Sequence, residues 1–106
     1  MLPEITVTDL KKKLDNGEDI QLVDVREPAE FEICHLPAIL IPLGDIPKKA
    51  ASISHNKPVI VICHHGFRSA QAIQYLSQRY GFSNLLNLKG GIHEWALKID
   101  QTMPTY

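Results

Sequence analysis

The feature that most restricts the fold of this chain is an uninterrupted apolar run at residues 58–63 (PVIVIC). A strand that is apolar on both faces is typical of the centre of a parallel sheet, where helices cover both sides. We therefore predict a central strand over residues 58–62. Other strand signals occur at residues 21–25 (QLVDV), more weakly at 85–88 and 39–41, and as an edge strand at 5–7.

The segments between these runs carry helix signals. Thr8 is expected to cap a helix over Asp9–Asn16, with Gly17 just beyond its end. Pro28 suits the first turn of a short helix that reaches Ile33.

Two further helices are expected in the second half of the chain. The clearest covers Ser69–Tyr80, because Ser69 is a good N-cap and Gly81 follows the last residue. Its predicted apolar stripe consists of Ala70, Ile73 and Leu76. A last helix is expected after Gly90 and Gly91, with an inner face made of Ile92, Trp95, Ala96 and Ile99.

The alternation of strand and helix signals predicts an α/β fold with a mainly parallel central sheet flanked by helices on both faces. The 106 residues suit a single domain, with its core at about residues 5–99 and a C-terminal tail at 100–106. In such folds ligands sit beyond the carboxyl ends of the strands. The expected site is therefore at Cys63, where the central strand ends.

Charge and composition argue against several classes of function. Eleven Lys and Arg residues against twelve Asp and Glu give a formal net charge of -1, so we expect no general attraction to nucleic acid or to a membrane surface. No stretch approaches the roughly 20 apolar residues that span a bilayer, and the first residues do not resemble a signal peptide. The two cysteines, Cys34 and Cys63, are too few for a disulfide scaffold. A cytoplasmic protein is expected.

The segment between the central strand and the next helix, residues 63–69, reads CHHGFRS and is typical of a nucleophile in an anion-binding loop. Cys63 precedes a helix N-terminus, whose partial positive charge favours a thiolate. Gly66 allows successive backbone N–H groups to turn inward around an anion. Arg68 can hold an oxyanion through two hydrogen bonds or fix the loop by ion pairing.

Loop length favours sulfur over phosphate as the group that Cys63 carries. Four residues separate Cys63 from Arg68. A phosphatase-like cradle would need one residue more, because a tetrahedral phosphate requires a wider ring of amides. A small phosphatase or arsenate reductase is therefore the less favoured interpretation.

Structural roles stay open beside these functional ones. A cysteine at the end of an apolar strand is often an inert packing residue. Arg68 can form a structural ion pair, for example with Asp24, as readily as it can contact a substrate. Asp24 and Arg26 are expected to support the site as a carboxylate–guanidinium pair that fixes the loop.

Three blocks of the sequence resemble the rhodanese family. They are residues 24–31 (DVREPAEF) with 35–37 (HLP), the loop at 63–69, and residues 87–95 (NLKGGIHEW). The blocks occur in the order of the family, and the resemblance runs from about residue 5 to residue 99. The chain is therefore similar to a single-domain rhodanese-like sulfurtransferase.

The resemblance implies a sulfurtransferase cycle that needs no metal or organic cofactor. The Cys63 thiolate would take the outer sulfur of thiosulfate or of a persulfide donor, and cyanide or a thiol would then remove it. The implied substrate-binding loop consists of His64, His65, Gly66, Phe67, Arg68 and Ser69, with His35 as a supporting residue beside Asp24 and Arg26. A thiol protein is an expected acceptor, whereas the physiological donor, the pathway and the oligomeric state stay open.

The sequence departs from the family pattern on both sides of His35. Cys34 stands where the family usually has glycine, and Pro37 is followed directly by Ala38, one residue short of the usual Pro-Gly-Ala turn. We expect this wall of the site to differ in shape, without a change in the identity of the nucleophile. Cys34 is either a resolving thiol or an ordinary small residue after a helix.

Two alternatives of other kinds remain. A metal site made of Cys63 and nearby histidines is disfavoured, because the adjacent side chains of His64 and His65 tend to diverge. These histidines are better suited to tune the field around an anion. The other alternative is a rhodanese-fold module that binds a protein partner without turning over sulfur, against which the intact Cys63 and the complete loop argue.

Overall fold

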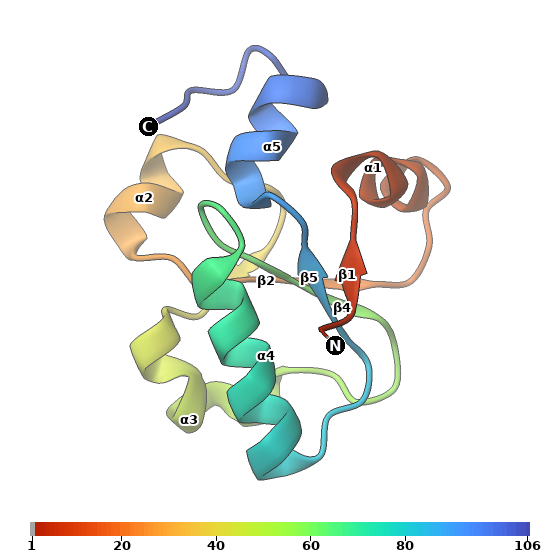
Figure 1. Ribbon diagram of the computed structural model, residues 1–106, viewed down its shortest axis with the longest axis vertical. Helices are drawn as coiled ribbons and strands as arrows, with labels where there is room; N and C mark the ends of the chain where they lie inside the picture. The colour runs from red at the N-terminus through yellow and green to blue at the C-terminus, as the bar shows by residue number, and fades with distance from the viewer. Residues whose placement is uncertain (1) are drawn as a thin grey trace.

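The computed structural model describes residues 2–106, over which five parallel strands form one sheet between two layers of helices (Figure 1). The strands lie in the order β1-β5-β4-β2-β3, and every neighbouring pair is parallel. This arrangement confirms the predicted α/β fold. The strands are β1 (Glu4–Ile5), β2 (Gln21–Asp24), β3 (Ile39–Leu40), β4 (Val59–Ile62) and β5 (Leu85–Leu88).

Helices cover both faces of the sheet, as predicted (Figure 1). Apolar residues of α3 and α4 pack on one face, and those of α1 and α5 pack on the other. The helices are α1 (Val7–Asp15), α2 (Pro28–Ile33), α3 (Ile46–Lys49), α4 (Phe67–Tyr80) and α5 (Gly91–Lys98). The sequence did not predict α3 or the single 3-10 turns beside it, Leu43–Asp45 and Ala50–Ser52.

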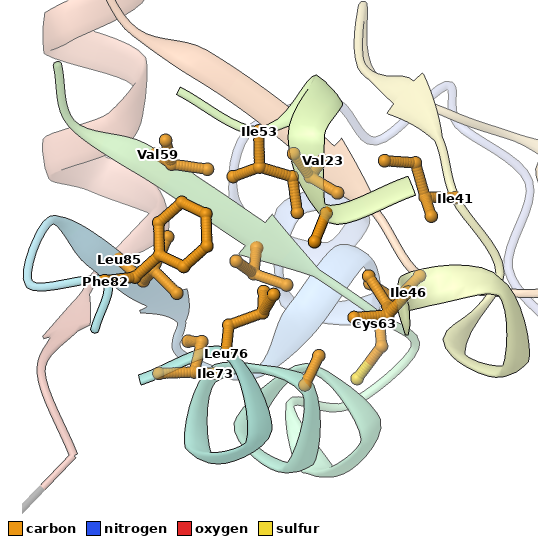
Figure 2. Packing of buried hydrophobic residues seen from close by; sticks show 14 residues of the cluster. Val23, Ile41, Ile46, Ile53, Val59, Cys63, Ile73, Leu76, Phe82 and Leu85 are labelled. Carbon is orange, nitrogen blue, oxygen red and sulfur yellow. The ribbon is translucent and has the colours of Figure 1, made fainter. Parts of the chain in front are cut away.

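Strand β4 is buried along its whole length at the centre of the sheet. Alternate side chains point to opposite faces of a strand, so Val59, Val61 and Cys63 join the cluster under α4, whereas Ile60 and Ile62 join the cluster under α1 and α5. Figure 2 shows Cys63 at one end of the first cluster. The apolar run that predicted a central strand therefore contributes side chains to the hydrophobic clusters on both faces of the sheet.

The register of the strands aligns their carboxyl ends. Asp24 of β2 pairs with Ile62 of β4, and Asn87 of β5 pairs with Val61 of β4. The residues that follow β2, β4 and β5 consequently emerge at the same edge of the sheet. Cys63 lies at this edge.

Two predicted helix starts are wrong by two residues. Helix α1 begins at Val7, because the Thr6 hydroxyl, rather than that of Thr8, accepts a hydrogen bond from the Asp9 backbone N–H at 3.1 Å. Helix α4 begins at Phe67, after Gly66 with a φ of 104°. Ser69 is therefore not an N-cap but a buried residue of the first turn. The buried face of α4 comprises Ser69, Ala72, Ile73 and Leu76, so that Ala70 lies at its margin.

The shortened turn after Pro37 is closed by a local hydrogen bond. The backbone N–H of Ala38 donates to the carbonyl of Leu36 at 2.7 Å, which is the spacing of a γ-turn. Strand β3 still pairs with β2, with Ile39 opposite Val23. Within residues 2–106, the structure contains no helix of the length and apolar character that crossing a membrane requires.

Candidate active site

The sulfur of Cys63 lies beside the first turn of α4. Its Sγ accepts a hydrogen bond from the Gly66 backbone N–H at 3.1 Å and lies 3.3 Å from the Ser69 hydroxyl oxygen. The residue is only 1% exposed. An N–H donor and the positive end of a 14-residue helix both stabilise negative charge on the sulfur. The structure thus brings together three residues that the sequence predicted for the site.

Asn87 of β5 holds both sides of the loop. It accepts a hydrogen bond from the Ser69 hydroxyl through Oδ1, and its amide nitrogen donates to the Gly66 carbonyl at 3.0 Å. With its proton directed to Asn87, the Ser69 oxygen can accept from a Cys63 thiol; for a thiolate, the hydroxyl must turn its proton toward the sulfur. This role of Asn87 was not predicted from the sequence, although a polar residue inside the otherwise apolar strand LLNL was a usable signal.

The first residues of α5 donate hydrogen bonds to carbonyl groups at the start of the loop. The backbone N–H groups of Ile92 and His93 donate to the carbonyls of Cys63 and His64 at 2.9 and 3.1 Å. Gly91 makes this approach feasible, because it has a φ of 65° and a Cβ there would lie 2.4 Å from the His64 carbonyl oxygen. With its first carbonyls bonded to α5, the loop can direct the Gly66 N–H toward the sulfur.

Arg68 forms an ion pair with Glu30 of α2, not with Asp24 as the sequence analysis suggested. Its two terminal nitrogens donate to the two carboxylate oxygens at 2.6 and 2.9 Å. These hydrogen bonds are the main reason that the pKa of Glu30 is lowered to about 2. Asp24 is unsuited to pair with Arg68, because it is fully buried and already bonded to Arg26. The far end of the loop is therefore anchored to α2.

The pair of Asp24 and Arg26 is fully buried at the end of β2. Arg26 donates to Asp24 through Nη2 at 2.7 Å and through Nε at 2.9 Å. It also donates to the carbonyl of Cys34 at 2.8 Å and to that of Glu30 at 3.2 Å. The expected carboxylate–guanidinium pair thus joins β2 to α2, which in turn carries Glu30, the partner of Arg68.

Three histidine rings gather near the loop. His64 is half-buried and stacks on Tyr106. Its ring centroid lies 3.9 Å from that of His65 and 5.8 Å from that of His93, so the side chains of His64 and His65 do not diverge as expected. Burial lowers the pKa of His64, which favours the neutral ring. Within the described part of the chain, no three His, Cys, Asp or Glu side chains are arranged to hold a metal ion.

Three further residues from the sequence analysis form no hydrogen bond with the Cys63 sulfur, whose partners are Gly66 and Ser69. His35 is exposed and contacts Phe31 of α2, through a ring stack and a hydrogen-bond distance of 2.7 Å from Nδ1 to the carbonyl. Phe67 is 82% exposed at the start of α4. Cys34 is a free thiol that packs in the cluster under α1 and α5, across the sheet from the cluster of Cys63.

Comparisons with known proteins identify the family of this chain. The rhodanese-like domain family matches residues 6–98. A sulfurtransferase of Allochromatium vinosum is 40% identical over 97 residues, covering 91% of this chain and 90% of its own. A putative sulfur carrier protein of Bacillus subtilis, YrkF, is 35% identical over 100 residues, covering 93% of this chain. The chain spans only about half (54%) of the length of that relative.

Among solved structures, a rhodanese-like domain protein from Staphylococcus aureus superposes with a TM-score of 0.83. Its sequence is 32% identical, and the match covers 99% of both chains. The fold, the order of the sequence blocks and the matched family all agree. This chain belongs to the rhodanese-like family.

Proposed function

We propose that this protein is a sulfurtransferase in which the Cys63 thiolate accepts a sulfane sulfur and carries it as a persulfide. The observation that carries the proposal is the hydrogen bond from the Gly66 N–H to Cys63 Sγ, at the head of α4. Membership of the rhodanese-like family, with relatives named as a sulfurtransferase and a putative sulfur carrier, supports the same chemistry.

The proposed cycle has two displacement steps at sulfur. The Cys63 thiolate attacks the outer sulfur of the donor, a new S–S bond forms, and the old bond breaks with its electron pair leaving on the donor fragment. That fragment is sulfite when thiosulfate is the donor and a thiolate when a persulfide is the donor. A second nucleophile then attacks the outer sulfur and releases the Cys63 thiolate.

Groups around Cys63 can stabilise the negative charge on sulfur at each step of the cycle. The Gly66 N–H and the N-terminus of α4 favour the thiolate before the first step. The Ser69 hydroxyl, 3.3 Å from Sγ, can turn its proton toward the sulfur when the thiolate forms. The amides of residues 64–68 are the proposed donors to the outer sulfur of the persulfide.

Arg68 contributes to this site mainly by fixing the loop. Its guanidinium is occupied by the Glu30 carboxylate through two short hydrogen bonds, so its charge is partly balanced before a donor arrives. A doubly charged thiosulfate gains less from such an arginine than from a free one. A persulfide donor is therefore proposed alongside thiosulfate.

The surface next to the site favours a thiol protein as the acceptor. Cys63 is only 1% exposed, whereas Phe67, four residues later, is 82% exposed. A persulfide places its outer sulfur about 2 Å beyond Sγ, where a second thiol has to reach it. Exposed aromatic residues are common anchors in protein interfaces.

Steady-state kinetics of the native chain and of Cys63→Ser test the proposal. We expect the native chain to transfer sulfur from thiosulfate or a low-molecular-weight persulfide to cyanide with ping-pong kinetics, and Cys63→Ser to be inactive. Turnover that survives in Cys63→Ser would contradict the assigned nucleophile. No turnover with either donor would favour the protein-binding module.

A further inference from the structure

The segment that follows α5 folds back onto the active-site loop. Helix α5 ends at Lys98, and a turn is closed by hydrogen bonds to the carbonyl and carboxylate of Asp100. The chain end then lies beside α2 (Figure 1). Residues 104–106 line a narrow crevice together with Cys34, His64, Ile92, His93 and Ala96, and the crevice is too small to admit a water molecule. The sequence indicates no more than a C-terminal tail for residues 100–106.

The hydroxyl of Tyr106 joins the two ion pairs of the site. It accepts a hydrogen bond from Arg26 Nη1 at 2.8 Å and donates one to Glu30 Oε2 at 2.8 Å. That carboxylate oxygen also accepts from Arg68. Burial raises the pKa of Tyr106 to about 12, so the hydroxyl keeps the proton that it donates to Glu30.

The ring of Tyr106 contacts the opposite end of the loop. It stacks on His64, with ring centroids 3.9 Å apart and planes inclined by 8°. His64 follows Cys63 directly, and its carbonyl is held by α5. Tyr106 thus touches the first residue of the loop directly and reaches Arg68, near its end, through Glu30.

We propose that Tyr106 is a positioning residue for the chemistry of Cys63. By contacting both His64 and Glu30, it holds the loop so that the Gly66 N–H points at Cys63 Sγ and Arg68 stays paired with Glu30. The inference rests on the proposed function for its role in sulfur transfer, but its effect on the thiol exists without any donor. The titratable and charged groups around Tyr106 are Arg26, Glu30, Arg68, His64 and His93.

The test compares Tyr106→Phe and Tyr106→Leu with the native protein. The Phe variant loses both hydrogen bonds and keeps the ring, whereas the Leu variant loses both kinds of contact. Tyr80→Phe is the matched control, because Tyr80 is 42% exposed at the far end of α4. The readout is the alkylation rate of Cys63 by iodoacetamide, measured by peptide mass from acidic to alkaline pH.

A positioning role predicts a shift in the pH midpoint of alkylation. We expect the midpoint to rise by about half a unit in Tyr106→Phe, corresponding to about threefold less thiolate below the midpoint. A larger rise is expected in Tyr106→Leu, and none in Tyr80→Phe. An unchanged midpoint with a faster plateau would mean that Tyr106 merely covers the loop, and would overturn the proposal. Unchanged midpoint and plateau in Tyr106→Phe would overturn it as well, even if Tyr106→Leu fails to fold.

A parallel measurement separates this inference from the proposed function. Sulfur loading of the same variants is followed by intact mass with a thiosulfate or persulfide donor. We expect loading to slow in the order native, Tyr106→Phe, Tyr106→Leu. If the native protein takes up no sulfur while the alkylation midpoint shifts as expected, the sulfurtransferase proposal fails and the positioning role of Tyr106 stands. A shifted midpoint with equal loading rates would overturn a role for Tyr106 in the transfer.

Discussion

Replacing Glu30 by Gln should remove a stabilising contribution that depends on pH. Hydrogen bonds to its carboxylate, chiefly the two from Arg68 with smaller contributions from the Glu27 backbone and Tyr106, lower the pKa of Glu30 from 4.5 to about 2. At about 1.4 kcal/mol per unit, this shift corresponds to about 3 kcal/mol of unfolding free energy at most. Because the two side chains are 34% and 20% exposed, solvent screening reduces the expected contribution to about 1–2 kcal/mol.

The sign of the effect follows from the direction of the shift. A carboxylate with a lowered pKa in the folded state stabilises the protein fully above the pKa of the unfolded chain. The contribution is then lost as the pH falls from 4.5 toward 2. The native protein should therefore exceed Glu30→Gln in unfolding free energy near neutral pH and approach it in acid.

Urea unfolding of both proteins between neutral pH and pH 2 measures this difference. The matched control is Glu32→Gln, because Glu32 is an exposed carboxylate on the same helix, α2. We expect this control to change the unfolding free energy by less than about 0.5 kcal/mol. A difference between native and Glu30→Gln that stays constant across the pH range, or that equals the difference for Glu32→Gln, would refute the reasoning.

Three other substitutions address the loop and the second thiol. Ser69→Ala removes the hydroxyl beside Sγ, so the Cys63 thiolate loses a hydrogen-bond donor and alkylation at neutral pH should slow several-fold. An unchanged rate would count against this hydrogen bond. Gly91→Ala places a Cβ 2.4 Å from the His64 carbonyl oxygen, so it should lower the unfolding free energy and slow alkylation of Cys63. The control Gly44→Ala, whose Cβ would meet no atom within 4 Å, should do neither. Equal behaviour of the two variants would refute the close approach of Gly91 to the loop. Cys34→Ser should leave sulfur loading on Cys63 unchanged, because the two thiols pack in different clusters; lost loading would instead support a resolving role.

The sequence predicted the fold and the position of Cys63 because both depend on local patterns. An apolar run on both faces specifies a central parallel strand, and the residue after it must emerge at the carboxyl edge of the sheet. A glycine three residues later supplies the positive φ with which α4 begins. These signals lie within one short stretch of sequence.

The sequence did not predict the contacts that connect distant segments. The ion pair of Arg68 with Glu30 spans 38 residues, and the hydrogen bond of Tyr106 with Glu30 spans 76. Both follow from the packing of α2 and of the chain end against the loop, which local patterns do not encode. The N-cap of α1 was predicted wrongly for a different reason. Thr6 and Thr8 are both good N-cap residues, and which of them caps the helix depends on where β1 ends.

Intact-protein mass tests the central claim, a persulfide on Cys63, most directly. The native chain, Cys34→Ser and Cys63→Ser are each incubated with thiosulfate and, separately, with a low-molecular-weight persulfide. We predict that the native chain and Cys34→Ser gain one sulfur, about 32 Da, that cyanide removes, and that Cys63→Ser gains none. An equal gain in Cys63→Ser, or no gain in the native chain with either donor, would contradict the account.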